Sequence, residues 1–310
     1  MVGFVYDDEY LGHDTGPGHP ERAERLVAVV RHLKESGRWE KLAHIKPREA
    51  SIDEVTAVHP ERHVRMVERR CVAGETVLDD GDTHVCPESF RVALLAAGAT
   101  LRAVDCVISG EVKRAFCAVR PPGHHAGTAR VMGFCLFNNV AVGARYAQKQ
   151  KGVNRIAIVD WDVHHGNGTQ EIFYSDPSVL YISLHQYPLW PGTGASGETG
   201  DGPGAGFTVN CPMKPGSGDA EYTEAFRSRI IPALNDFQPE LLMLSAGFDA
   251  HRMDPLANIN LDDKSFETMT LMMRDVAERW CGGRIVSVLE GGYDRDALAR
   301  CVALHLDTLD

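Results

Sequence analysis

Short apolar runs rich in β-branched residues alternate along this chain with longer amphipathic stretches. The short runs are bounded by turn-forming residues, which is typical of strands. They predict strands at residues 2–6, 115–119, 155–160, 179–184, 207–211, 241–246 and 284–289. Because these runs are continuously hydrophobic rather than alternating, both faces of the resulting sheet should be covered.

The amphipathic stretches between these runs predict helices. The first begins at Pro20, which suits the first helical position, and ends at Gly37. Similar patterns predict helices near residues 88–105, 136–150, 219–235 and 263–281. The Gly-rich stretch 192–206 lies between two predicted strands, so we expect a long loop over the sheet edge there. Strands that alternate with helices indicate an α/β fold with a mostly parallel sheet.

The amino-acid composition and net charge exclude some classes of function. The 310 residues are 44% hydrophobic and 24% charged, which is typical of a globular protein, and we expect one domain over 1–310. A formal net charge of −11 argues against a nucleic-acid binder. The eight cysteines form no C-x-x-C pair, which favours a reducing compartment. With no signal-peptide pattern and no apolar run of membrane-span length, we expect a cytoplasmic protein without membrane contact.

The strongest chemical signal follows the predicted strand 155–160. Asp160, Asp162 and His164 alternate at its carboxyl end, where open α/β sheets bind ligands. Asp249 follows the strand 241–246 in the same way. Clustered carboxylates repel one another unless a cation joins them, and two aspartates with one histidine leave a position open for water on a catalytic zinc ion.

Two further strands end in reactive side chains. His124 and His125 follow the strand 115–119 in a rigid Pro-Pro-Gly turn, where paired imidazoles suit general acid–base work. Tyr293 follows Gly291-Gly292 after the strand 284–289, and its hydroxyl could donate to a developing oxyanion. A Gly-Gly-Tyr string alone would be a weak signal, since a surface tyrosine in a turn has the same sequence.

These strings, in this order, resemble the arginase–deacetylase superfamily, and more closely the zinc histone deacetylases and histone deacetylase-like amidohydrolases. His19-Pro20-Glu21-Arg22, the segment from Gly133 to Asn139 and Ser183-Leu184-His185 extend the resemblance over nearly the whole chain. The resemblance implies a three-layer fold with a central, mostly parallel sheet and helices on both faces. It also implies zinc-dependent hydrolysis of acyl amides.

The resemblance assigns roles to the clustered residues. Asp162, His164 and Asp249 match zinc ligands, and His125 matches the general base with His124 as its electrostatic partner. Asp160 matches the carboxylate that orients the first histidine, and Tyr293 matches the tyrosine that polarises the carbonyl. At the position beside the second histidine, Asn167 replaces the aspartate of many relatives, as in the class II branch.

The resemblance also implies a substrate tunnel and ion sites. Phe134 and Trp190 are expected to form the tunnel walls, with Gly133 beside them and the apolar Leu256 at the rim. Arg25 matches an arginine that lines an internal cavity below the zinc. One potassium site would be formed by Asp160, Asp162, His164, Ser183 and Leu184. A second, built mostly from carbonyl groups, would be formed by Phe173, Asp176, Val179 and Phe207.

We compared several functions with this set of residues. We expect an acylated lysine peptide or protein, or a small acyl-amine, as substrate. The nearest alternative is an acetylpolyamine amidohydrolase, whose acidic gatekeeper position corresponds to Leu256 here. An arginase-like binuclear manganese enzyme would need bridging carboxylates that Asp249-Ala250-His251 does not supply. A binding protein without activity would have lost part of the catalytic set. The sequence leaves the oligomeric state open, a homo-oligomer included.

Overall fold

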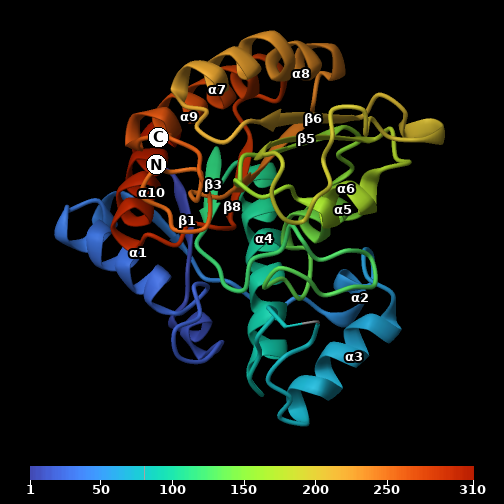
Figure 1. The fold of residues 1–310 in the computed structure, drawn as a ribbon, viewed down its shortest axis with the longest axis vertical. Coiled ribbons are helices and arrows are strands. Elements are labelled where there is room, and N and C mark those ends of the chain that lie inside the picture. The colour runs from blue at the N-terminus through green and yellow to red at the C-terminus, as the bar shows by residue number, and fades with distance from the viewer. Residues whose placement is uncertain (80) are drawn as a thin grey trace.

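The computed structural model, which describes residues 1–79 and 81–310, is built around one parallel β-sheet (Figure 1). Its eight strands lie in the order β2-β1-β3-β8-β7-β4-β5-β6. Their bounds are β1 Gly3–Val5, β2 Ala43–Ile45, β3 Arg114–Cys117, β4 Ile156–Asp160, β5 Val179–Gln186, β6 Thr208–Met213, β7 Leu241–Ala246 and β8 Ile285–Leu289. All neighbouring strands pair in parallel, so their carboxyl ends share one edge of the sheet.

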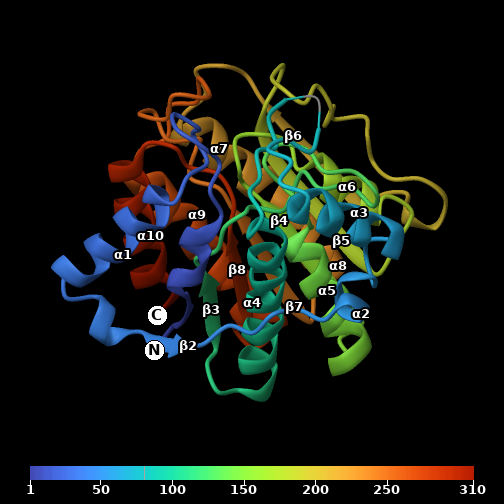
Figure 2. The ribbon, with the colours of Figure 1, turned by 90° about the horizontal axis from the view of Figure 1, so that it is seen from below.

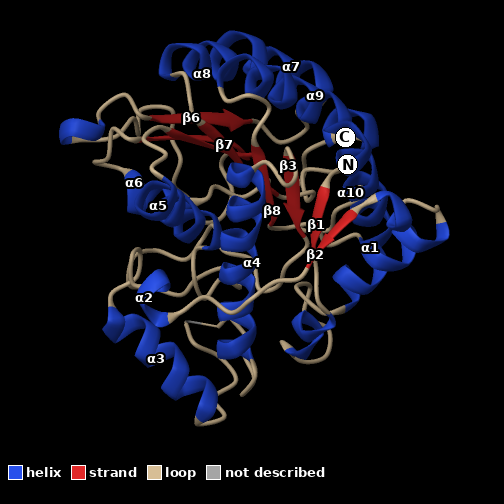
Figure 3. Ribbon diagram, turned by 180° about the vertical axis from the view of Figure 1, so that it is seen from behind, coloured by secondary structure: helices blue, strands red, loops and turns tan. Residues whose placement is uncertain are grey.

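Helices cover both faces of the sheet. In Figure 2 the central strands lie between α1, α9 and α10 on one side and α4 and α5 on the other, and Figure 3 shows this layering from behind. The helices are α1 Glu24–Glu35, α2 Ile52–Val55, α3 Glu61–Val72, α4 Ser89–Ser109, α5 Asn139–Lys151, α6 Asn167–Phe173, α7 Asp219–Ala225, α8 Ile231–Phe237, α9 Asp263–Trp280 and α10 Arg295–Leu309. The predicted three-layer α/β architecture is therefore confirmed.

Helix α4 shows why apolar length alone does not identify a membrane span. Contrary to the expectation that no run would reach span length, its 21 residues are long and apolar enough to cross a membrane. However, 78% of its most apolar window is buried inside the protein. The helix packs against α5 and β3, so its apolar surface belongs to the core.

Other differences from the sequence prediction have local causes. The sheet is wholly parallel rather than mostly so, and it gains β2, an edge strand of three residues that is too short to give a pattern. The first helix begins at Glu24, four residues after Pro20, although Gly37 does adopt the left-handed conformation just beyond its end. The predicted helix 219–235 is divided into α7 and α8 by a π-helical turn at Phe226–Ile230. Helices α2, α3, α6 and α10 were not predicted.

The parallel arrangement determines where chemistry can occur. Strand β4 lies between β5 and β7, with Asp160 opposite Ser183 on one side and Ser245 on the other. The Gly-rich stretch 192–206 is a loop from β5 to β6, as predicted, apart from a single helical turn at Gly202–Gly204. Loops that leave β3, β4, β7 and β8 therefore meet at the carboxyl edge of the sheet.

Candidate active site

A group of three potential metal ligands occupies the centre of this edge. One donor atom from each of Asp162, His164 and Asp249 lies within 4.8 Å of the other two. His164 Nδ1 is 3.2 Å from a carboxylate oxygen of Asp162 and 3.1 Å from one of Asp249. The structure thus brings together the side chains that the sequence placed after two different strands, β4 and β7.

Backbone groups orient both carboxylates. The amide of Val163 donates to Asp249 Oδ1 at 2.8 Å, and the amide of Gly291 donates to Asp162 Oδ2 at 2.7 Å. The close approach of β8 requires glycine at 291, because a Cβ there would lie 2.2 Å from an Asp249 oxygen. The loop after β8 therefore fixes the geometry of a site whose ligands come from β4 and β7.

The electrostatics of this group favour a bound cation. Burial and the nearby charge of Asp162 raise the pKa of Asp249 to about 7. Burial opposes a charge on His164, but Asp162 and Asp249 outweigh it and raise the pKa of the imidazole to about 10. A buried carboxylate that attracts a proton, as Asp249 does, also attracts a divalent cation. One nitrogen and two oxygen donors suit zinc and leave room for water or substrate.

The tandem histidines are held at this site by a carboxylate that the sequence analysis missed. Glu290 at the end of β8 accepts hydrogen bonds from the amides of Gly123, at 2.7 Å, and His124, at 3.2 Å. Its other oxygen accepts the Ser245 hydroxyl at 3.1 Å. Glu290 is fully buried, and this burial raises its pKa to about 7. The turn after β3 is thereby anchored to β8.

The two imidazoles have different partners. His124 Nδ1 lies 3.0 Å from Asp160 Oδ2, which also accepts the hydroxyl of Tyr181 at 3.0 Å. Burial opposes charge on His124, but Asp160 and Asp162 raise its pKa to about 10. His125 Nδ1 instead lies 2.8 Å from the amide oxygen of Asn167. Because that oxygen only accepts, His125 carries its proton on Nδ1 and keeps Nε2 free as an acceptor.

The protonation states differ accordingly. Burial lowers the pKa of His125 well below its usual value, and the positive charges of His124 and His164 lower it further. The ring centroids of His124 and His125 are 3.9 Å apart, so a charge on one disfavours a charge on the other. The neutral amide of Asn167 adds no compensating negative charge. His125 is therefore neutral beside a charged His124.

Side chains expected to take part in catalysis face one cavity of about 210 Å³. His125, His164 and Tyr293 contribute to its wall, whereas His124 does not. The rest of the lining includes the four residues expected in the tunnel, Gly133, Phe134, Trp190 and Leu256. Two further residues that line it, Asp82 and Leu189, were not expected there. The ring of Trp190 packs edge-on against His125 with centroids 4.7 Å apart.

Tyr293 is positioned by its neighbours on two sides. Asp254 accepts the Tyr293 amide at 2.7 Å and also the amide of Leu256 at 3.0 Å, so one carboxylate anchors both. Arg25 lies over the tyrosine ring, 5.0 Å from its centroid. Arg25 also donates to the carbonyl oxygen of Gly292 at 2.7 Å and pairs with the buried carboxylate of Glu21 at 3.0 Å, which compensates for its complete burial. The internal cavity expected beside Arg25 stays a prediction.

The rim differs from the expected neutral surface. Leu256 does line the cavity, but Asp82 places a carboxylate at the same mouth. Burial and the neighbouring Asp79 raise the pKa of Asp82 to about 6. Glu198, which could have supplied an acidic group from the Gly-rich loop, turns inward and accepts Gln170 Nε2 at 2.6 Å. Asp82 therefore places an acidic group in the cavity lining.

The potassium sites remain predictions. The first would use residues that do lie together, since Asp160 pairs with Ser183 across β4 and β5. For the second, the turn between α6 and β5 brings Phe173, Asp176 and Val179 together. The fourth residue, Phe207, accepts the Tyr181 amide at 2.9 Å through its carbonyl oxygen. The carboxylate of Asp176 is paired with Arg145 at 2.6 Å, so only its carbonyl would serve.

Comparisons with known proteins agree with this geometry. The histone deacetylase domain model matches residues 19–309. A probable deacetylase of Archaeoglobus fulgidus is 44% identical over 295 residues, covering 94% of this chain and 81% of the relative. A histone deacetylase-like amidohydrolase of Pseudomonas aeruginosa is 39% identical, covering 97% and 83% respectively. The crystal structure of the HDA15 HD domain superimposes with a TM-score of 0.95 at 39% identity, covering 100% of this chain and 89% of that one.

Proposed function

Because this chain belongs to the histone deacetylase family of hydrolases, we propose that it is a zinc-dependent deacylase that acts on N-acyl-lysine side chains. The observation that supports this most directly is the shared cavity. His125, His164 and Tyr293 line it together, beside aromatic walls suited to an alkyl chain. A base, a metal ligand and an oxyanion donor thus face the same small volume.

Asp162, His164 and Asp249 would hold the zinc ion. When bound, zinc would polarise the acyl carbonyl and lower the pKa of a water molecule. The neutral His125 accepts a proton from the attacking water at Nε2, with Asn167 holding its Nδ1–H. The same imidazole then delivers that proton to the departing amine nitrogen. His124, charged and paired with Asp160, stabilises the negative charge that develops nearby.

Tyr293 completes the reaction. Burial raises the pKa of its phenol well above the usual value, so the hydroxyl is protonated and donates to the carbonyl oxygen. Phe134 and Trp190 would flank the butyl stem of the acyl-lysine. The products are a carboxylate and a free amine.

Metal retention tests the ligand assignment. Asp249→Ala removes a ligand and leaves Asp162 and His164 without their third partner. The variant should lose both zinc, measured by metal analysis after dialysis, and deacylase activity. Purified Asp249→Ala protein with stoichiometric zinc and normal turnover would refute the assignment.

Substrate choice tests the proposal against an acetylpolyamine amidohydrolase. Asp82 at the rim is an observation in favour of that alternative, because a carboxylate attracts a second ammonium group. Leu256 beside it favours lysine. We expect acetyl-lysine peptides to exceed N8-acetylspermidine in kcat/KM by at least about tenfold, or about 1.4 kcal/mol. Faster hydrolysis of the polyamine by the same zinc-loaded enzyme would reverse the choice.

A further inference from the structure

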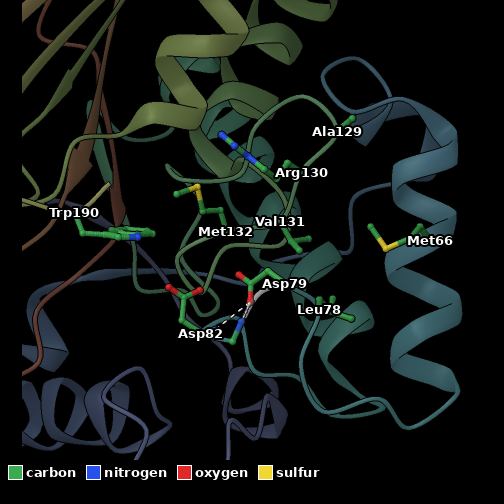
Figure 4. A pocket seen from close by; sticks show the side chains of 10 residues that line it. Met66, Leu78, Asp79, Asp82, Ala129, Arg130, Val131, Met132 and Trp190 are labelled. Atoms are coloured by element: carbon green, nitrogen blue, oxygen red, sulfur yellow. Dashed lines mark hydrogen bonds between the residues drawn. The ribbon is translucent and has the colours of Figure 1, made fainter. Parts of the chain in front are cut away.

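A groove of about 650 Å³ begins at the mouth of the catalytic cavity. Asp82 and Trp190 line both spaces, so the two lie next to each other. Figure 4 shows Trp190 at one end of the groove and Met66 of α3 at the other. Its volume lies in the range of about 300–1,000 Å³ typical of ligand sites. A substrate whose acyl-lysine enters the cavity can therefore place its neighbouring residues in this groove.

Two loops form the facing walls. One contributes Leu78, Asp79 and Asp82, and the other runs from Ala129 to Met132. The first is closed by a bridge between Val77 and His84, and the second by a bridge between Gly127 and Arg130. Asp79 also accepts the amides of Gly81, Asp82 and Thr83.

The lining combines apolar side chains, the carboxylates of Asp79 and Asp82, and one accessible cation. Leu78 and Val131 are almost fully buried and Met66 is half-buried, so Met66 offers most of the apolar surface for a hydrophobic residue. The side chain of Arg130 is 59% exposed, and its nearest acidic partner, Glu171, lies 3.8 Å away. Exposed pairs of this kind contribute little, so Arg130 can exchange this partner for a ligand carboxylate.

We propose that this groove binds the polypeptide segment next to the acyl-lysine, with an apolar side chain on Met66, Leu78 and Val131 and an acidic side chain opposite Arg130. The proposal rests on the proposed deacylase function and names its substrate class as acylated peptides or proteins rather than free acyl-amines. Because the groove runs from the mouth toward α3, it accepts residues from one side of the acyl-lysine.

The test compares peptides with a minimal substrate. The zinc-loaded enzyme is assayed with acetyl-lysine capped at both ends and with peptides extended by Leu and Glu toward either terminus. One direction of extension should raise kcat/KM by at least about tenfold through a lower KM, the size of a 1.4 kcal/mol contribution. The other direction should have little effect. Equal values for all substrates, or gains on both sides, would overturn the proposal.

Reversing the charge of Arg130 tests whether this groove is the part of the protein that binds the flanking residues. In Arg130→Glu, peptides with Glu should lose the gain and peptides with Lys in its place should acquire it. Met66→Glu should remove the preference for the apolar residue. Arg227→Glu changes the net charge equally at an exposed site on the π-helical turn after α7, away from the groove, and should leave both preferences unchanged. Identical flank preferences in Arg130→Glu and the wild type would refute the assignment.

The assays give different results if the groove proposal is wrong and if the deacylase proposal is wrong. If the capped acetyl-lysine is hydrolysed but flanking residues have no effect, the groove proposal is wrong and the deacylase proposal stands. If no acyl-lysine substrate is hydrolysed, the function is wrong, and fluorescence anisotropy of the labelled peptides still reports whether Arg130 binds the acidic flank. Absence of binding there would overturn the groove proposal as well.

Discussion

Tyr293 is expected to act through one hydroxyl. Tyr293→Phe keeps the ring that contacts Arg25 and Phe134 and removes only the donor to the carbonyl oxygen. Loss of one oxyanion donor costs roughly 10²–10³ in kcat, so we expect that decrease with little change in substrate binding. Steady-state kinetics and inhibitor affinity measure the two effects separately. A loss below about threefold would show that the hydroxyl does not contact the oxyanion.

The tandem histidines should differ in the same kind of assay. His125→Ala removes the imidazole that lines the cavity, whereas His124→Ala removes one that does not. We therefore expect His125→Ala to lower kcat far more than His124→Ala, because a positioned base contributes roughly 10²–10⁴-fold. The retained zinc content of both proteins serves as the control. Equal losses, or the reverse order, would overturn this division of roles.

Residue patterns predicted the centre of this site and not its supports. Asp162, His164, Asp249 and Tyr293 each follow a buried strand, and parallel strands bring such residues to one edge. Glu290 also ends a strand, but its partner is the amide of Gly123, 167 residues away in sequence. A hydrogen bond between such distant residues leaves no local pattern.

At the scale of elements, loops were harder to predict than strands. Asp82 lies between α3 and α4 with no strand before it, so nothing in the sequence placed it at the cavity. Helix α10, in contrast, carries a signal that was missed. Asp294 accepts the amide of Ala297 as an N-terminal cap immediately before an apolar periodic run. The strand β2 gave no such signal, because three residues are too few to show periodicity.

The loop from β5 to β6 carries Trp190, and a partly buried polar network holds it. Glu198 accepts the amide of Gly194 at 3.1 Å and the side-chain NH₂ of Gln170 at 2.6 Å. The oxygen of Gln170 then accepts from His165 Nε2 at 3.0 Å, which leaves His165 Nδ1 to accept the hydroxyl of Thr193 at 2.7 Å. The network thus extends from Glu198 to within three residues of the tunnel wall.

Glu198→Gln should therefore loosen the tunnel wall at Trp190. Gln presents a second NH₂ group to Gln170, and hydrogen bonds to charged groups contribute about 1.5–3 kcal/mol. We expect KM for acetyl-lysine peptides to rise about tenfold or more while kcat changes less than about threefold. Asp201→Asn, an exposed acid in the same loop, is the matched control and should change neither. A fall in thermal stability without a change in KM would mean that Glu198 serves only the fold.

At the scale of the whole molecule, buried histidines link stability to pH. His305 of α10 lies between Thr270 of α9, at 2.7 Å, and Ser287 of β8, at 3.0 Å, and so joins a covering helix to the sheet. Burial lowers its pKa to about 3. His13 and His59 are buried elsewhere, and burial also lowers the pKa of each to about 3. In the unfolded chain the pKa of each imidazole returns to about 6.5.

The sign of the effect follows from these values. Above about pH 6.5, His305 is neutral in the folded and in the unfolded protein, so it does not change the free energy of unfolding. Between about pH 6.5 and about 3, this histidine is protonated only in the unfolded chain, so stability falls as the pH falls. Near pH 5 each such histidine adds a slope of about 1.4 kcal/mol per pH unit to the free energy of unfolding.

His305→Gln stays neutral and can still hydrogen-bond to Thr270 and Ser287. Urea unfolding between pH 5 and 7 should therefore show a shallower pH dependence for the variant, by about 1.4 kcal/mol per pH unit near pH 5 and by less as the pH rises through about 6.5. His44→Gln, which replaces an exposed imidazole, is the control and should keep the wild-type slope. If His305→Gln also keeps the wild-type slope, His305 is not a neutral link between α9, α10 and the sheet.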